Sequence, residues 1–332
     1  MRTITIVAAA MLLGACSGDK TDDTGSPSDT DADADVDADA DADADADTDT
    51  DTAILDTADT AAVAEAVCAR WQDVRAALVD GTWSGDVGSC SPGDVSSDGR
   101  DSSLALWNLY REMAGHGPIT TDAGLDANAQ DCALIQQANG YLTHTPASSA
   151  TCYTSSGASA AGLSNIASTN VVDAIDLYMI DPGNSTTLGH RRWLLSNGLA
   201  TVGIGGTSSY SCHTVIGAGG GGTSKEWTAW PPAGPVPEEV WTVSWDHLDD
   251  TGWSLQSDSL ALGSGTVTVT GDDGSTLPMT VSSLISGYGS THALSMIPDG
   301  WTVEAGRSYT VSVSGLSSPV DYTVDVVDCD AL

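Results

Sequence analysis

Apolar positions recur with one period in the first part of the chain and with another in the last part. From residue 100 onward the spacing is helical, and one set of apolar residues returns at three-residue steps: Leu104, Trp107, Tyr110 and Met113. This spacing predicts an amphipathic helix over 100–115. Further helices are expected over about 125–142 and 171–180, followed by a pair of strands over 201–205 and 210–216.

Beyond residue 240 the period changes to two. Valine or tyrosine alternates with threonine or serine at several places: Val267, Val269, Val311, Val313, Tyr322, Val324 and Val326. Short alternating segments between turn signals predict an antiparallel β-sandwich, with an immunoglobulin-like arrangement expected over 240–332. Four prolines fall within 231–239 and predict a stiff linker between two domains. The expected fold class is therefore α+β, with the first domain over 66–230.

The N-terminus carries an export signal. One arginine precedes a short apolar run that is too short to span a bilayer. The run ends in Leu13-Gly14-Ala15-Cys16, which resembles a bacterial lipobox, so 1–16 is expected to be a lipoprotein signal peptide with Cys16 as the lipidated residue. An ordinary signal peptide with an incidental cysteine is the alternative. We expect a protein held in the cell envelope by lipid, in the outer membrane and facing outward or into the periplasm.

The segment 17–65 is of low complexity. It holds 17 Asp against one Lys between Asp19 and Asp59, in alternation with Ala and Thr. Such a segment has little to bury and is expected to be a disordered, extended spacer. The chain as a whole has a formal net charge of −36. Nucleic acid is therefore excluded as a partner, because binding to phosphates requires a basic surface.

Six cysteines remain once Cys16 is set aside, and an even number outside the cytoplasm predicts three disulfides. Proximity in sequence favours the pairs Cys68–Cys90 and Cys132–Cys152, which leaves Cys212–Cys329. Metal ligation is the alternative, although no CxxC or Cys/His spacing of a zinc site occurs.

Several ordered segments resemble the CAP superfamily of cysteine-rich secretory, antigen 5 and pathogenesis-related proteins, also called the SCP-like extracellular domain. They lie within residues 100–206: Leu106-Trp-Asn-Leu-Tyr-Arg-Glu112, Asn139-Gly-Tyr-Leu-Thr-His144, Ser164-Asn-Ile-Ala167, Gly189-His190-Arg and Val202-Gly-Ile-Gly205. Each segment is weak alone, and their order and spacing make the resemblance specific. It implies an α-β-α sandwich.

In that family two His and two Glu often face one cleft and can hold a divalent metal. The resemblance places His144 and His190 at the histidine positions, Asp181 near the second glutamate position and Ser164 at the first, so one carboxylate is missing. The implied ligand cleft comprises these residues and Asn165. Weak binding of a metal such as zinc by His144 and His190 is also implied, and no cofactor is required.

The lost carboxylate favours a surface lipoprotein that binds a small lipid, peptide or envelope component without catalysis. A metal-assisted hydrolase of peptidase type, with His144, Asp181 and His190 at its centre, is the alternative. A purely structural or adhesive envelope protein is a third. No catalytic residue is assigned at this stage.

Overall fold

The computed structural model describes residues 57–217, 219, 222 and 224–332, and these residues belong to one compact unit that spans 54–332. The expected signal peptide and lipidation site at Cys16 lie outside the described residues. So does the expected spacer up to residue 56, whereas residues 57–65 of that spacer belong to a helix. No helix among the described residues is long and apolar enough to cross a membrane.

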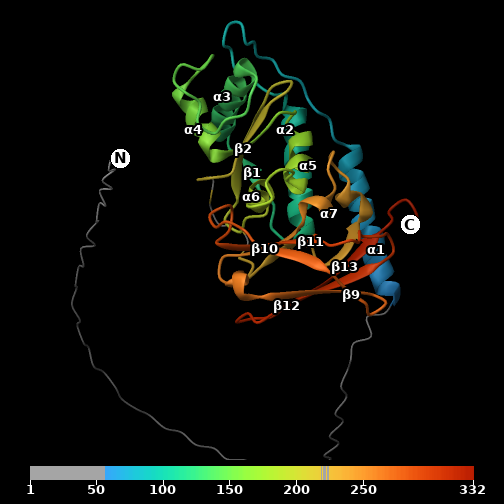
Figure 1. The fold of residues 1–332 in the computed structure, drawn as a ribbon. Coiled ribbons are helices and arrows are strands. Elements are labelled where there is room, and N and C mark those ends of the chain that lie inside the picture. The colour runs from blue at the N-terminus through green and yellow to red at the C-terminus, as the bar shows by residue number, and fades with distance from the viewer. Residues whose placement is uncertain (1–56, 218, 220–221, 223) are drawn as a thin grey trace, which may run out of the picture. The chain divides into compact units, whose positions relative to one another are not determined.

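The first part of the unit is a three-layer α-β-α sandwich, preceded by the helix α1 (Figure 1). Its helices are α1 (Thr57–Ala76), α2 (Ser97–Met113), α3 (Ala123–Asn139), α4 (Ser155–Leu163), α5 (Asp173–Ile180) and α6 (Gly189–Leu194). Its strands are β1 (Thr120–Thr121), β2 (Ser164–Ala167), β3 (Thr201–Gly206) and β4 (Ser211–Thr214). They form one sheet in the order β1-β3-β4-β2, in which only the β1–β3 pair is parallel.

Alternation along β3 separates the two helical layers. Val202 and Ile204 are fully buried in the core that includes α2 and α5. Gly203 and Gly205 face α3, so closely that a Cβ at Gly205 would lie 2.1 Å from the backbone nitrogen of Gln130. The glycines are therefore what allows α3 to lie directly on the sheet.

Helix α2 confirms the expected helix and corrects its buried face. Trp107 and Tyr110 are fully buried, whereas Leu104 and Met113 are only partly buried. The buried face of α2 also includes Leu106 and small residues on neighbouring turns. A helix repeats every 3.6 residues, so side chains at three-residue steps turn progressively away from the core.

The second part is a β-sandwich with three short helical elements. It comprises β5 (Thr228–Trp230), β6 (Gly234–Pro237), η1 (Glu238–Trp241), α7 (Leu248–Thr251), β7 (Trp253–Ser257), η2 (Leu262–Ser264), β8 (Thr266–Gly271), β9 (Thr276–Leu277), β10 (Met279–Ser283), β11 (His292–Pro298), β12 (Ser308–Ser314) and β13 (Val320–Val327). The two sheets have the orders β10-β11-β7-β5 and β6-β13-β12-β8-β9. The expected alternation holds on β13, where the buried residues are Val320, Tyr322, Val324 and Val326. The immunoglobulin-like arrangement stays a prediction.

The expected linker over 231–239 is wrong. Residues 234–237 form β6, which pairs in parallel with β13, and Val236 is fully buried. Proline is tolerated in β6 because this strand lies at the edge of its sheet and need not donate on both sides. The prolines therefore mark an edge strand of the sandwich and not a linker.

All three expected disulfide pairings are wrong. The bonds are Cys68–Cys329, Cys90–Cys152 and Cys132–Cys212, with sequence separations of 261, 62 and 80 residues. Sequence proximity is a poor guide because the entropy cost of closing a loop grows only slowly with its length. Which cysteines meet is decided by the fold: Cys132–Cys212 joins α3 to β4, and Cys68–Cys329 joins α1 to the C-terminal segment.

Candidate functional site

A pocket of about 410 Å³ opens where the ends of several elements of the α-β-α part meet a loop of the sandwich. It is lined by His144, Ser164, Asn165 and His190 together with residues of the 183–189 segment. Four of the five residues expected to share a cleft therefore lie around one cavity, and the fifth, Asp181, does not line it.

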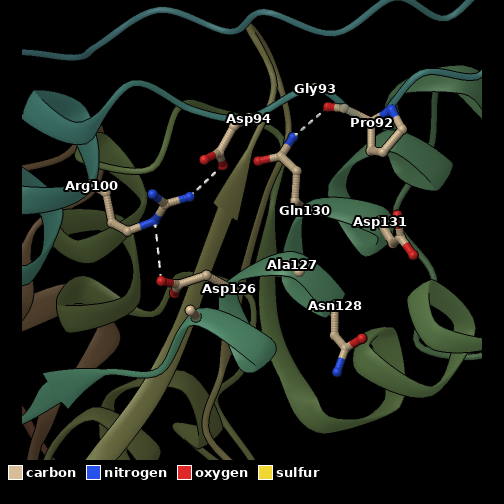
Figure 2. Close-up of a pocket in the computed structure, with 10 residues that line it drawn as sticks. Pro92, Gly93, Asp94, Arg100, Asp126, Ala127, Asn128, Gln130 and Asp131 are labelled. Carbon is tan, nitrogen blue, oxygen red and sulfur yellow. Dashed lines mark hydrogen bonds and ion pairs between the residues drawn. The ribbon is translucent and has the colours of Figure 1, made fainter.

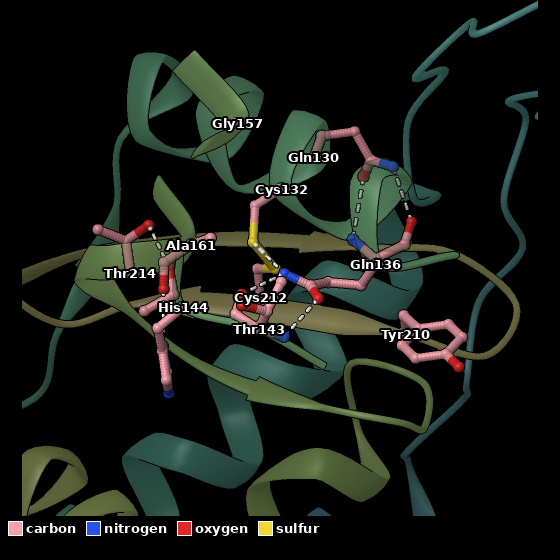
Figure 3. Close-up of a disulfide and its surroundings, with 12 residues drawn as sticks. Gln130, Cys132, Gln136, Thr143, His144, Gly157, Ala161, Tyr210, Cys212 and Thr214 are labelled. Atoms are coloured by element: carbon pink, nitrogen blue, oxygen red, sulfur yellow. Dashed lines mark hydrogen bonds between the residues drawn. A yellow bond between two sulfur atoms is a disulfide. The ribbon is translucent and has the colours of Figure 1, made fainter. Parts of the chain in front are cut away.

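His144 follows α3 and is held from two sides (Figure 3). The buried Gln136 of α3 makes two hydrogen bonds to the backbone of Thr143. Its Nε2 donates to the Thr143 carbonyl at 2.8 Å, and its side-chain oxygen accepts from the Thr143 N–H at 2.9 Å. The ring nitrogen Nδ1 of His144 lies 2.8 Å from the carbonyl oxygen of Ala161 in α4. The disulfide Cys132–Cys212 fixes α3 on the sheet behind this pair of contacts.

His190 is oriented by Asp181, which lies behind it rather than in the pocket. Helix α5 ends at Asp181, which has a left-handed backbone (φ 59°), a conformation that Asp tolerates better than most residues. The turn directs its carboxylate inward, 2.8 Å from Nδ1 of His190 and 3.3 Å from the backbone nitrogen of Arg191. Because its side chain has no exposed surface, Asp181 cannot touch a ligand, and its expected place in the cleft is wrong.

The two imidazoles therefore present the same atom for binding. The Ala161 carbonyl and the Asp181 carboxylate only accept hydrogen bonds, so each Nδ1 carries a proton when the ring is neutral. Nε2 of each ring is then left as an acceptor. Tyr178, fully buried, lies under the His190 ring with its centroid 4.9 Å away.

Ser164 and Asn165 form the wall between the histidines. Both are buried on β2, where the Ser164 hydroxyl lies 3.2 Å from that of Thr214 and the Asn165 amide donates to the carbonyl of His190 at 3.1 Å. A hydroxyl thus occupies the position where a carboxylate is found in the family that the sequence resembles. The wall carries no charge.

A metal site does not fit the residues present. Zinc sites in proteins use three or four protein ligands. Within the described part of the chain no three side chains among His, Cys, Asp and Glu converge on one point. Asp181 is occupied by His190, and Ser164 offers no carboxylate, so His144 and His190 remain two donors without a third.

The remaining lining is apolar, with Val215, Ile216 and two aromatic residues, and it comes partly from the sandwich. Trp193 of α6 and Tyr288 of the loop between β10 and β11 both line the pocket. The Tyr288 ring covers the start of α6 so closely that a Cβ on Gly189 would lie 2.7 Å from its Cδ1 atom. Arg192 holds the loop, donating to the carbonyl oxygens of Ile285 at 2.7 Å and Ser290 at 3.0 Å.

The comparison with family models decides the identity of this part. The model described as the cysteine-rich secretory protein family, CAP, matches residues 104–216. The chain contains a CAP domain. Comparison with curated proteins and with solved structures gives no match.

The match includes β2, α5, α6, β3 and β4, together with both histidines of the pocket. The CAP domain and the three disulfides are features of an extracellular or secreted protein. They confirm the expected superfamily and the expected α-β-α sandwich.

Three arginines of the CAP domain are buried, and two of them, Arg191 and Arg192, join it to the sandwich. Arg111, Arg191 and Arg192 donate mainly to backbone carbonyls, and burial lowers the pKa of each guanidinium to about 10. Arg191 donates to the carbonyls of Met179 at 2.6 Å and Gly252 at 2.6 Å, so one side chain joins α5 to the sandwich.

A second cavity, of about 330 Å³, lies at the start of α3, beside the loop that precedes α2 (Figure 2). Its polar side chains are already used: Arg100 pairs with Asp94 and lies 3.5 Å from Asp126, and Gln130 donates to the carbonyls of Pro92 and Gly206. Burial raises the pKa of Asp126. This group braces the loop before α2.

A serine–histidine pair that the sequence did not reveal lies below the pocket. His213 Nε2 is 3.1 Å from the Ser103 hydroxyl, and both residues are fully buried. The hydroxyl also donates to the carbonyl of Val171 at 2.8 Å. The pair has no access to solvent and no carboxylate on Nδ1, so it is a packing feature rather than a nucleophile.

Sequence reasoning missed Gln136, Arg192 and Tyr288 as residues that shape the site. Gln136 carried a signal, because a polar residue on the inner face of a helix must find partners. Arg192 lies two residues after the recognised His190. Tyr288 had no signal, since it lies about 100 residues away in a loop of the sandwich.

Proposed function

We propose that this extracellular, SCP-like protein binds a small ligand in the pocket around His144 and His190, without catalysis. The observation that supports it most is the pairing of both Nδ1 atoms with protein oxygens, which fixes two ring edges as acceptors at one cavity. A preformed cavity with a few oriented polar groups is typical of ligand sites. The hydroxyl at Ser164 supports binding over reaction, because the pocket lacks an exposed carboxylate to act as a base.

We further propose that lipid on Cys16 anchors the protein in the envelope, with the acidic segment as a spacer. The Leu13-Gly14-Ala15-Cys16 sequence supports this. Substituting Cys16→Ser should move the protein from the membrane fraction to the soluble fraction. Retention of the variant in membranes would contradict the anchor.

The binding proposal is tested by nuclear magnetic resonance of the histidine side chains in the full chain. Probes of three kinds are titrated: a short-chain phospholipid, a short peptide and a soluble neutral oligosaccharide. At least one should shift the ring signals of both His144 and His190, which are assigned from His144→Gln and His190→Gln. If no probe moves either ring, the pocket does not bind ligands of these classes and the proposal fails.

One observation favours a hydrolase as the second candidate. The buried Asp181 carboxylate at 2.8 Å from Nδ1 of His190 has the arrangement that orients a general base in acyl-transfer enzymes. Among the described residues, however, no hydroxyl or thiol is hydrogen-bonded to His190. Turnover of ester or peptide substrates that is lost in Asp181→Asn would establish this candidate and defeat the binding reading. If the protein is not catalytic, the wild type itself shows no turnover and Asp181→Asn makes no difference.

A further inference from the structure

Among the described residues that line the CAP pocket there is no Asp, Glu, Lys or Arg. They present hydroxyl and amide side chains together with two aromatic rings: Ser164, Asn165, Asn184, Thr187, Trp193 and Tyr288. We infer that the ligand is a neutral sugar ring of a glycan, and that Tyr288 of the sandwich determines this specificity by stacking on it. The inference rests on the proposed function of the pocket as a binding site.

Charged ligands fit this pocket poorly. A buried charge needs a partner of opposite sign, and the nearest candidates are already taken. Asp181 has no exposed side-chain surface and pairs with His190. Arg191 and Arg192 are fully buried and donate to carbonyls and hydroxyls of the protein. The chain's formal net charge of −36 also repels polyanions before they reach the site.

The polar lining suits a ligand covered with hydroxyl groups. Each sugar hydroxyl both donates and accepts, so it can donate to the Nε2 acceptor of a histidine or to the amide oxygen of Asn184, whose nitrogen is bonded to Asp181. The back wall is strand β2, where the buried residues Ser164 and Asn165 are polar. An acyl chain would leave the Nε2 acceptors of His144 and His190 without a donor, which disfavours a lipid tail in the pocket.

The aromatic wall supplies the complementary surface. A pyranose ring has an apolar face of C–H bonds, which packs on the electron-rich face of an aromatic ring. Tyr288 has 38 % of its surface exposed and lines the cavity at the start of α6. Its loop is fixed to the CAP domain by Arg192 and by the N–H of Ile285, which donates to Thr186 at 3.0 Å. The ring is therefore held in place before any ligand arrives.

The test is a titration of the full chain with the neutral tetramer of β-1,4-linked N-acetylglucosamine, read by the ring signals of His144 and His190 and by calorimetry. Tyr288→Ala should weaken binding at least about tenfold, and Tyr288→Phe should retain it within about threefold, because stacking needs the ring and not the hydroxyl. Tyr141→Ala is the matched control: Tyr141 is 53 % exposed and lies outside the pocket. Thermal melting confirms that each variant is folded.

The outcomes separate the two levels of the proposal. A peptide or phospholipid that shifts both rings while the tetramer does not would overturn the sugar assignment and leave the proposed function standing. Equal affinity of Tyr288→Ala and wild type for the tetramer would overturn the role of Tyr288. Absence of any shift with every probe would remove the binding function itself. Tighter binding of the deacetylated, cationic tetramer than of the neutral one would overturn the argument from charge.

Discussion

Two histidines outside the pocket are buried in places that disfavour their charged form. Burial lowers the pKa of His213 to about 3, and burial together with the nearby Arg111 and Lys225 lowers that of His116 to about 3. The ordinary pKa of a histidine side chain is 6.5. Between about pH 3 and pH 6.5 the unfolded chain binds more protons than the folded protein. The free energy of unfolding therefore falls as the pH drops through about 6.5 toward 3.

This linkage predicts a measurable slope. Each of the two histidines should cost about 2 kcal/mol of unfolding free energy at about pH 5 relative to neutral pH. Urea unfolding at a series of pH values should show the decline, and His116→Gln/His213→Gln should flatten it. Tyr322→Phe is the matched control, since it removes a buried polar group whose pKa burial raises away from this range. A slope in the double variant equal to that of wild type would contradict the assignment.

At the residue scale, the sequence identified both histidines of the pocket, and geometry supplied what surrounds them. His144 and His190 could be identified because each belongs to a sequence motif at the end of a helix, and such a motif determines where its ring lies. The direction of Asp181 could not, because it depends on the left-handed turn that closes α5. Tyr288 required the packing of the sandwich on the CAP domain.

The contact between β3 and α3 depends on two strand residues without side chains. A methyl group at Gly205 would lie 2.1 Å from the nitrogen of Gln130 and 2.2 Å from the carbonyl carbon of Ala129. Both are backbone atoms of a helix that is also tied to the sheet by the disulfide Cys132–Cys212, so the helix has little freedom to withdraw.

Gly205→Ala should therefore destabilise the protein by about 2–3 kcal/mol or more, as overpacked cores do. Gly198→Ala is the control, because a Cβ there would meet nothing within 4 Å. Both variants are compared by chemical denaturation. A loss in Gly205→Ala no larger than that in Gly198→Ala would show that α3 can shift at low cost.

At the scale of elements, periodicity predicted α2, α3, α5 and the β3–β4 pair, with boundaries shifted by a few residues. Helix α1 was missed, although Ala64, Cys68, Trp71 and Val74 form its buried stripe. The acidic composition of the preceding segment obscured this short pattern. The prolines of β6 were misread as a linker because an edge strand and a linker carry the same local sequence signal.

The CAP domain and the sandwich share one hydrophobic core. The cluster that includes Trp107 and Ile175 continues through Trp230 into Trp253 and Val311. Strand β7 is buried along its whole length. Its Leu255 belongs to that core, while the Gln256 amide donates to the carbonyl of Leu195 at 2.8 Å in the CAP domain.

A chain truncated after Trp230 should consequently fail to fold, because it would expose the apolar faces that the sandwich covers. The expected readout is loss of near-ultraviolet circular dichroism and of a cooperative thermal transition. A chain that begins at Thr57 is the matched control and should unfold in a single transition, as expected for the unit over 54–332. Cooperative unfolding of the truncated chain would show that the two parts are independent.

The bond between Cys68 and Cys329 closes nearly the whole described chain into a covalent ring. A protease that cuts once at any exposed loop within this ring produces a nicked molecule whose two pieces remain attached. Such a product migrates as one species until a reductant is added. In an environment rich in proteases, this protein would tolerate a first cleavage without shedding its pocket, and only a second cut or reduction of the disulfide would release a fragment.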